Sequence, residues 1–342
     1  MGRRVLVTGL GAFWGGRVAK ALEADPSVEV IIGLDTREPQ VELERTEYVR
    51  SDENYSILSR IVRATQVDTI VHTFLVVDST SMRARAMHEI NVIGTMNLFA
   101  AAADSSVRNV VVKSSSYVYG CHPRDPTWFT EDTPRHDPLR HQVERSLAEV
   151  ESYVRDFAVD NPHVDVSLLR FSNVLGNDIT TPLSRMLEAP VVPSVFGYDP
   201  RFQFVHENDV IRAVLFVLEQ NLAGIYNVAG DGLLPWSEVA AICGKRTWPL
   251  PPVGQGLVGA ALRVLGIDIP PEVVDLLSYG RGIDNSRLKE LGFDYTHTSA
   301  GTVRAFIETL RLRRTVGEPQ AYRYRQEVED FFKRSPAVVR RD

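Results

Sequence analysis

Short apolar runs alternate with amphipathic stretches over about the first 170 residues of the chain. The apolar runs are rich in β-branched residues and predict buried strands at 5–7, 28–34, 48–50, 69–71, 109–113 and 164–171. The amphipathic stretches predict helices at 16–24, 57–64, 87–103 and 145–157. Because strands and helices alternate, we expect an α/β fold with right-handed crossovers and a parallel, doubly wound sheet.

This regular alternation ends near Asn173. Prolines and glycines become frequent through 182–200, and a helix at 210–218 and a strand at 225–228 follow. From Gly230 onward the chain is rich in turn-forming residues. The change of pattern predicts a second, smaller structural unit.

The chain is therefore expected to have three parts. Residues 1–173 form the sheet domain, to which 204–229 return. Residues 174–203 and 230–310 form a smaller, partly discontinuous C-terminal domain. Residues 311–342 form a basic tail, with nine lysines and arginines against five acids and a net charge of +4. We expect this tail to be a peripheral helix, with contact to a partner or an anionic membrane as the alternative.

Composition narrows the class of protein. The 342 residues contain 38 basic and 44 acidic side chains, which give a net charge of −6, and 44% are hydrophobic. These values are typical of a globular protein and argue against a dedicated nucleic-acid binder. Two cysteines, Cys121 and Cys243, cannot form a disulfide framework, so we expect a cytoplasmic protein. The eight histidines lack the spacing of metal ligands, so no metal is expected.

No integral membrane segment is expected from the sequence. Arg3 and Arg4 precede an apolar run of only three residues, which is too short for a signal peptide. The most apolar stretch, 257–269, is interrupted by Arg263 and Asp268. We expect it to be a core or lid helix, with an interfacial membrane helix as the alternative.

A glycine-rich turn directly follows the first strand and opens the first helix. Glycines there permit a tight turn and close approach of a pyrophosphate, which the helix N-terminus would bind through its free N–H groups. Asp35 lies 20 residues after Gly15, at the end of the second strand, where a carboxylate can bind the adenosine ribose. This carboxylate favours NAD over NADP, although the nearby Arg37 leaves NADP open.

Further motifs follow in the order typical of one family. They are Thr-Gly-x-x-Ala-x-x-Gly at 8–15, Asn-Val-Ile-Gly-Thr at 91–95, Ser-Ser-Ser-Tyr-Val-Tyr-Gly at 114–120, Arg-Phe-Ser-Asn-Val-Leu-Gly at 170–176, Phe-Val-His-Glu-Asn-Asp-Val at 204–210, Gly-Ile-Tyr-Asn-Val at 224–228 and Leu-Gly-Phe at 291–293. With these motifs the chain resembles the extended short-chain dehydrogenase/reductases over about residues 3–300. More narrowly, it resembles the NAD-dependent epimerase/dehydratase family, the relatives of UDP-glucose 4-epimerase.

The resemblance implies a Rossmann-type, NAD-binding sheet domain, a C-terminal substrate domain and a nucleotide-sugar substrate. It also implies a homodimer formed through the helices at 87–103 and 145–157. The cofactor-binding residues that it implies are Gly9, Ala12, Phe13, Trp14, Gly15, Asp35, Arg37, Asp52, Thr73, Phe74, Asn91, Ser114 and Arg145. The substrate-binding residues that it implies are Ser116, Asn173, Arg201 and Arg281.

The chain departs from the family at its catalytic centre. The resemblance places Ser115 where the family's serine holds the reacting oxygen, but the Tyr-x-x-x-Lys motif is missing. Alignment puts His141 on the tyrosine and Arg145 on the lysine. His141 is then either a substitute acid–base, with Arg145 holding the ribose, or a solvated helix residue. Tyr117 is a second candidate for proton transfer, with packing as its alternative role.

The leading hypothesis is an epimerase/dehydratase-like enzyme acting on a nucleotide sugar through hydride transfer and a keto intermediate. Two alternatives fit the same residues. The chain could be a catalytically silent NAD-binding sensor or scaffold, which the missing Tyr-x-x-x-Lys favours. It could also be a reductase of a carbonyl compound that is not a sugar.

Overall fold

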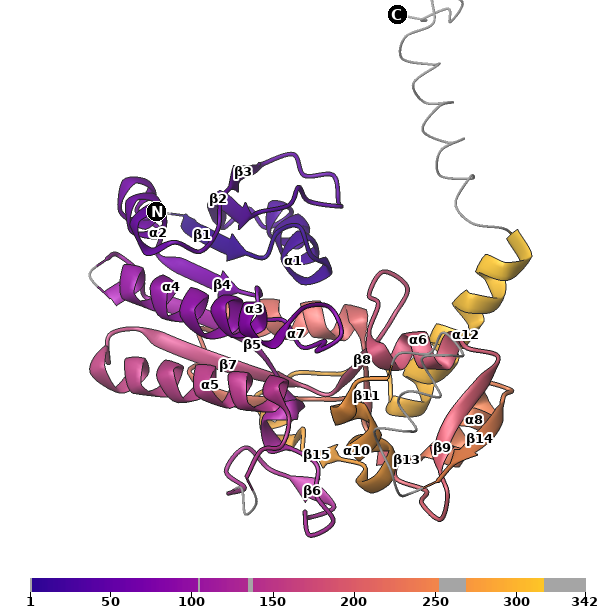
Figure 1. Cartoon of the computed structure of the whole chain (residues 1–342). Coiled ribbons are helices and arrows are strands. Elements are labelled where there is room, and N and C mark those ends of the chain that lie inside the picture. Colours follow the sequence, from indigo (N-terminus) through magenta and orange to yellow (C-terminus); the bar gives the residue numbers. More distant parts are fainter. Residues whose placement is uncertain (1, 104, 135–137, 252–268, 317–342) are drawn as a thin grey trace, which may run out of the picture.

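A seven-stranded parallel sheet forms the centre of the N-terminal domain (Figure 1). The computed structural model describes residues 2–103, 105–134, 138–251 and 269–316. The strand order is β12-β7-β5-β4-β1-β2-β3. The strands are β1 (Arg3–Thr8), β2 (Val28–Asp35), β3 (Thr46–Arg50), β4 (Thr69–His72), β5 (Asn109–Ser115), β7 (Asp165–Phe171) and β12 (Gly224–Val228). The parallel sheet and its crossovers confirm the predicted fold class.

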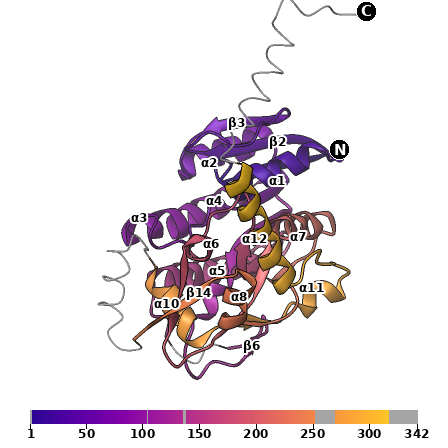
Figure 2. The ribbon, with the colours of Figure 1, turned by 90° about the vertical axis from the view of Figure 1, so that its right-hand side faces the viewer.

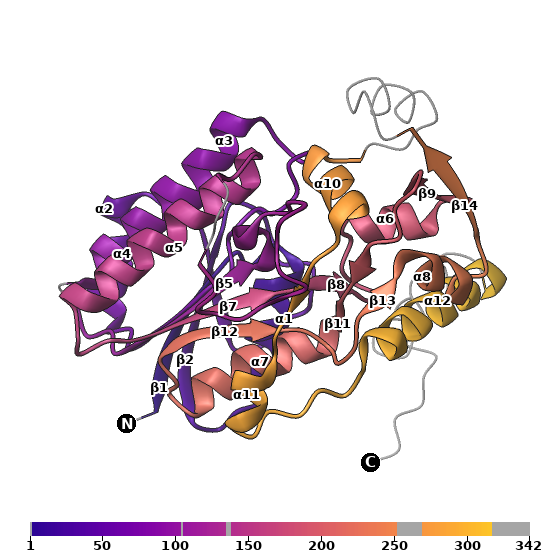
Figure 3. The same ribbon diagram turned by 90° about the horizontal axis from the view of Figure 1, so that it is seen from below.

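Helices cover both faces of this sheet, as Figures 1 and 3 show. One face carries α2 (Tyr55–Thr65), α3 (Ala84–His88), η1 (Glu89–Ile93), α4 (Gly94–Ala103) and α5 (Gln142–Asp160). The other carries α1 (Phe13–Glu23) and α7 (Glu207–Glu219). Each helix buries its apolar stripe against a strand, at about 25 cal/mol per Å² of apolar surface removed from water. This is why the amphipathic pattern predicted these helices.

The helix expected at 87–103 contains a π-helical turn. Helix α3 passes into η1 and then into α4 without leaving the helical path. Asn91 lies in this turn, and its amide binds both the N–H and the carbonyl of Val76, each at 2.8 Å. The wider turn thus accompanies a side chain that fixes the loop after β4, a use typical of π-helical turns. Periodicity alone did not predict it.

The second domain packs beside the carboxyl ends of the strands. Its core includes Phe202, Phe204 and Trp236, with the Phe202 and Trp236 ring centroids 4.4 Å apart. Helix α12 lies against β11 and α8 (Figure 2). The helices of this region are α6 (Pro182–Glu188), α8 (Trp236–Ile242), α10 (Pro271–Tyr279) and α12 (Ser299–Val316), whereas α11 (Ser286–Glu290) packs against β12 of the main sheet.

Four short strand pairs lie outside the main sheet in the described part of the chain. The parallel pairs are β8 (Asn173–Leu175) with β11 (Phe204–His206), β9 (Val191–Val195) with β14 (Arg246–Leu250), and β6 (Trp128–Phe129) with β15 (Gly282–Ile283). The antiparallel pair is β10 (Arg201–Phe202) with β13 (Leu234–Pro235). Residues 224–228 return to the main sheet as β12, beside β7. A short 3-10 helix, η2 (Ser116–Tyr119), follows β5 directly.

Two expectations fall largely outside the described residues. The helix expected at 257–269 lies outside them except for Ile269, which is buried. The tail expected at 311–342 begins inside α12, which continues to Val316, and its remaining residues lie outside. Within the described ranges, no helix combines the length and apolarity needed to cross a bilayer.

Candidate functional site

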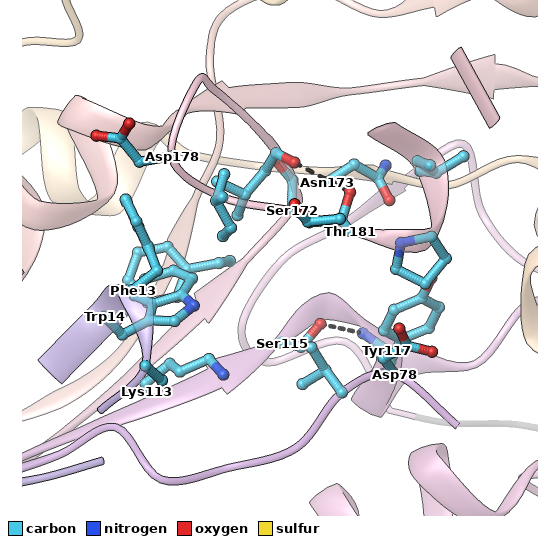
Figure 4. Close-up of a pocket in the computed structure, with 18 of the residues that line it drawn as sticks. Phe13, Trp14, Asp78, Lys113, Ser115, Tyr117, Ser172, Asn173, Asp178 and Thr181 are labelled. Carbon is cyan, nitrogen blue, oxygen red and sulfur yellow. Dashed lines mark hydrogen bonds between the residues drawn. The ribbon is translucent and has the colours of Figure 1, made fainter. Parts of the chain in front are cut away.

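A cavity of about 440 Å³ lies where the carboxyl ends of the central strands face the second domain (Figure 4). In open α/β sheets this crevice is the usual ligand site. Its walls come from the glycine-rich turn, β5 with η2, the end of β7 and the segment that leads into α6. The lining residues include Ala12, Phe13, Trp14, Arg37, Val77, Asp78, Lys113, Ser114, Ser115, Tyr117, Phe171, Asn173, Asp178, Thr181 and Leu183.

The turn between β1 and α1 has the geometry of a phosphate-binding loop. Gly9 adopts a φ of +76°, and a Cβ on Gly15 would lie 2.3 Å from the Gly9 carbonyl oxygen, so both positions require glycine. Ala12 caps α1 with extended backbone and no side-chain hydrogen bond. The first N–H groups of α1 are therefore not capped by the Ala12 side chain, and Ala12 to Trp14 line the cavity.

Asp35 organises the end of this turn. Its carboxylate is buried and accepts hydrogen bonds from the N–H groups of Gly11 and Arg37, both at 2.9 Å. The Arg37 side chain is exposed and lines the cavity. The ribose end of a dinucleotide would thus meet a carboxylate with an arginine beside it. The uncapped helix start, the two glycines and this carboxylate together fit an adenine dinucleotide.

Alternate residues of β5 face opposite sides of the sheet. The last three side chains of the strand, those of residues 113–115, therefore do not all point the same way. Lys113 and Ser115 share one face, and Figure 4 shows both beside the cavity. Ser115 Oγ accepts a hydrogen bond from the Tyr117 N–H at 3.3 Å. Ser114 donates its hydroxyl to Glu151 of α5 at 2.6 Å instead. The Ser114 hydroxyl is therefore engaged with α5, although Ser114 still contributes to the cavity wall.

Lys113 is a cavity residue that sequence reasoning missed. Its Nζ donates to the Leu75 carbonyl at 2.6 Å and lies 5.0 Å from the centroid of the Trp14 ring. Burial lowers the pKa of its amine from 10.5 to about 7. The available signal was a lysine at the end of an apolar central strand, where a charged side chain is costly.

Trp14 and Phe171 form the apolar wall behind this lysine. Their ring centroids lie 4.7 Å apart, and the Trp14 side chain is almost fully buried. These rings keep the inner end of the cavity low in polarity. A charge placed there is poorly solvated, so the protonation state of Lys113 responds strongly to whatever binds beside it.

Tyr117, the second candidate for proton transfer, does line the cavity. The Arg281 guanidinium lies 4.7 Å from the centroid of its ring. Although that cation opposes the effect, burial raises the pKa of the Tyr117 phenol well above its usual value. The phenol therefore remains protonated at neutral pH and is suited to donating a hydrogen bond.

His141 and Arg145 are not among the residues that line the cavity. His141 is the N-cap of α5, and its Nε2 lies 2.9 Å from Asp275 Oδ2 of α10. Burial opposes its charged form, but the hydrogen bond to Asp275 and the nearby Glu144 raise its pKa above the usual value. Arg145 is exposed and donates to the Arg140 carbonyl at 2.7 Å. Proton transfer by His141 and ribose binding by Arg145 remain predictions.

The other expected cofactor residues are not among those that line the cavity. Thr73 is buried and donates its hydroxyl to the Thr8 carbonyl at 2.7 Å, close to Gly9. Phe74 follows it and packs near Gly9 as well. Asn91 holds the loop after β4, as described above, and Asp52 is exposed beyond β3. Thr73 and Phe74 therefore support the glycine-rich turn, whereas Asn91 and Asp52 are not among the residues that line the cavity.

Of the four expected substrate residues, one is among those that line the cavity and three are not. Asn173 lines the cavity and donates to the Gln203 carbonyl at 2.9 Å. Ser116 is buried in η2. Arg201 is exposed in β10, outside the cavity wall. Arg281 is buried and donates to the Gly120 carbonyl at 2.8 Å, so it joins the two domains.

No group of three or more histidines, cysteines or carboxylates that could hold a metal ion occurs in the part of the chain that the structure describes. The polar side chains that line the cavity include those of Ser115, Tyr117, Lys113, Asp78 and Asp178.

These features define a doubly wound α/β protein with a Rossmann-type sheet and a cleft between two domains. A family model, the NAD dependent epimerase/dehydratase family, matches residues 5–229. The chain belongs to this family, which is part of the extended short-chain dehydrogenase/reductases.

An uncharacterized protein of Mycobacterium tuberculosis is 35% identical over 317 residues, covering 90% of this chain and 84% of the relative. Among solved structures, MoeE5 in complex with UDP-glucuronic acid and NAD gives a TM-score of 0.71 at 21% identity, covering 90% of this chain and 99% of that one. DesIV, a dTDP-glucose 4,6-dehydratase from Streptomyces venezuelae with NAD bound, gives 0.70 at 24% identity, covering 92% and 99%. At these identities the two structures establish the fold alone.

Proposed function

We propose that this chain binds NAD in the cavity and acts on a nucleotide sugar by reversible hydride transfer through a keto intermediate. The observation that carries the proposal is that one cavity is lined by both the start of α1 and the β5 serine. A dinucleotide held by the α1 N-terminus would extend toward Ser115 along the same crevice. NAD supplies the hydride acceptor when bound.

The chain's own residues would bind and orient. The uncapped N–H groups at the start of α1 would hold the pyrophosphate, and Asp35 would hold the ribose. Ser115 would hold the reacting oxygen of the substrate, and the protonated Tyr117 phenol would donate a further hydrogen bond. Trp14 and Phe171 would keep water from the reacting carbon.

The relatives support this substrate class. MoeE5 has been solved with UDP-glucuronic acid and with UDP-glucose, and DesIV is a dTDP-glucose dehydratase. We extend the nucleotide-sugar class to this chain on the basis of family membership and the cavity.

The second candidate function is a catalytically silent NAD-binding protein. It is favoured by the absence of Tyr-x-x-x-Lys and by the engagement of His141 with Asp275 outside the cavity wall. Turnover separates the two candidates, because both require NAD binding and only the first converts a sugar.

The test uses the purified full chain. Released nucleotide is measured after denaturation, and the protein is incubated with UDP-glucose or dTDP-glucose and NAD⁺ while epimer and keto product are followed by NMR. We expect bound NAD and product. Ser115→Ala should lower turnover by about 10²-fold or more while NAD binding persists, and Ser115→Thr should retain most of it. Bound NAD without any product favours the silent protein.

A further inference from the structure

Lys113 faces the site of the proposed reaction from the floor of the cavity. It precedes Ser115 by two residues on β5, so both side chains project from the same face of the strand. Figure 4 shows the lysine extending along the cavity between Trp14 and Ser115. Its Nζ donates to the Leu75 carbonyl at 2.6 Å. Within the described residues, no carboxylate forms an ion pair with it.

The surroundings of the Lys113 amine contain one influence that favours its neutral form and others that favour its charged form. Burial without a counterion favours the neutral amine, and the buried His72 of the neighbouring strand β4 adds no positive charge, because burial and Lys113 lower its own pKa to about 3. The Trp14 ring, 5.0 Å away, and the Leu75 carbonyl stabilise the ammonium instead. Because the two effects oppose each other, a proton can be gained or lost there near neutral pH. A general base is most effective under this condition.

We propose that Lys113 is the proton-transfer residue of the reaction, acting on the substrate hydroxyl that Ser115 holds. The inference rests on the proposed function. In the oxidative direction the hydroxyl O–H bond breaks, and the proton forms an N–H bond on the neutral Nζ. The hydrogen on the same carbon would leave as hydride, for which bound NAD⁺ would supply the acceptor, and the C–O bond would become a carbonyl. In the reductive direction the Lys113 ammonium returns the proton to the oxygen.

The two other candidates are placed less well for this role. His141 hydrogen-bonds to Asp275 and is not among the residues lining the cavity. Tyr117 lines it, but burial keeps its phenol protonated, so it is a poor base at neutral pH. Lys113 thus combines access to the cavity, the same strand face as Ser115 and an exchangeable proton. It would replace the function of the missing Tyr-x-x-x-Lys from a different element.

The first test does not depend on turnover. The chain contains only five lysines, so NMR of lysine-labelled full-length protein resolves each amine, and Lys113→Met assigns the signal. We expect the Lys113 signal to titrate near pH 7. Lys20 is the control, because its hydrogen bond to Glu23 raises its pKa above 10.5. A Lys113 signal that titrates near 10.5 would overturn the inference and leave the proposed function intact.

The second test compares Lys113→Met and Lys113→Arg with the surface control Lys289→Met. We expect both Lys113 variants to bind NAD⁺ within a few-fold of the unmodified chain. Both should lose at least about 10²-fold in turnover of UDP-glucose or dTDP-glucose, since neither side chain exchanges a proton near pH 7. The kcat/KM of the unmodified chain should rise through a pKa near 7 in the oxidative direction.

Two outcomes separate the claims. If Lys113→Met turns over at the unmodified rate, the proton-transfer role is wrong and the proposed function stands. If the unmodified chain binds no NAD or converts no substrate, the proposed function fails and the inference fails with it. Thermal unfolding of each variant shows that a loss of turnover is not a loss of fold.

Discussion

At the residue scale, the cavity contains the buried amine of Lys113, and burying an amine without a counterion lowers the stability of the fold. Lys113 has a carbonyl and an indole ring as neighbours and no counterion within the described residues. A protein of this kind retains such a group when function needs it, because stability alone would favour an apolar side chain. Stability and activity should therefore respond to its replacement in opposite directions.

We expect Lys113→Met to raise the melting temperature while it lowers turnover at least about 10²-fold. Methionine has a similar length and removes the cost of burying an amine, and each kcal/mol gained raises Tm by about 2–4 °C in a large domain. Because burial lowers the native pKa to about 7 from 10.5, the unfolded chain binds more protons between these values. The advantage of the methionine variant should thus be greatest below about pH 7 and decline toward pH 10.5.

Unfolding midpoints at pH 6, 8 and 10 check this expectation, with Lys289→Met as the surface control. A destabilised Lys113→Met protein, or an advantage that does not change with pH, would mean that the amine is not held in a low-polarity site.

At the element scale, His141 connects the start of α5 to α10. Its backbone N–H donates to Glu144 at 3.0 Å and its imidazole pairs with Asp275, 134 residues further along the chain. This is the arrangement of a helix cap with a tertiary anchor. The geometry accounts for a histidine here without a catalytic role.

His141→Asn tests that account, because asparagine is also a good N-cap but cannot form a charged pair with Asp275. We expect a loss of about 1–2 kcal/mol near pH 6 and nearly unchanged turnover. Since the pair raises the pKa of His141, its stabilisation is present below the unfolded value of about 6.5 and is lost as pH rises through the higher folded value. The loss should therefore shrink by pH 9.

Denaturant unfolding at pH 6 and 9, together with turnover, provides the measurement. If His141→Asn abolished turnover at unchanged stability, proton transfer would return to His141 and the role given to Lys113 would be contradicted.

The elements also show how far sequence reasoning reaches. Central parallel strands are buried on both faces, so they are apolar runs and were predicted to within a few residues. The strand pairs of the second domain contain only two to five residues, too few to show a period, and were not predicted. The π-helical turn depends on Asn91 meeting the Val76 loop, a tertiary contact that local sequence does not encode.

In the candidate site, too, the residues that were predicted differ from those that were missed in how far their roles depend on tertiary contacts. The glycine-rich turn and Asp35 were predicted from local backbone geometry and spacing, and Ser115 was predicted from the resemblance of the 114–120 motif to the family. Lys113 was missed because its importance depends on what surrounds it, namely Trp14 from α1 and Leu75 from the loop after β4. The alignment placed His141 at the position of the family's catalytic tyrosine. In the structure its imidazole hydrogen-bonds to Asp275 of α10, a contact that the alignment could not indicate.

At the scale of the whole molecule, two domains meet over the carboxyl ends of the strands, and the cavity lies at their junction. Arg281 joins them, because it donates to the Gly120 carbonyl and lies over the ring of Tyr117. The end of the 114–120 motif therefore contacts the second domain directly. The proposed function requires this junction to bind NAD with its phosphates at the start of α1. Ala12, which caps that helix without a hydrogen bond, is the position at which the claim can be tested.

The most direct measurement is calorimetric titration of NAD⁺ into the full chain and into Ala12→Asn and Ala12→Asp. Both side chains cap a helix well, so both variants should fold with an unchanged or higher Tm. The aspartate adds a negative charge where the pyrophosphate would lie. We predict that the unmodified chain binds NAD⁺ most tightly, that Ala12→Asn binds it more weakly because its side chain competes for the same N–H groups, and that Ala12→Asp binds at least about tenfold more weakly than Ala12→Asn. Equal binding by all three proteins, or no binding by the unmodified chain, would contradict the account.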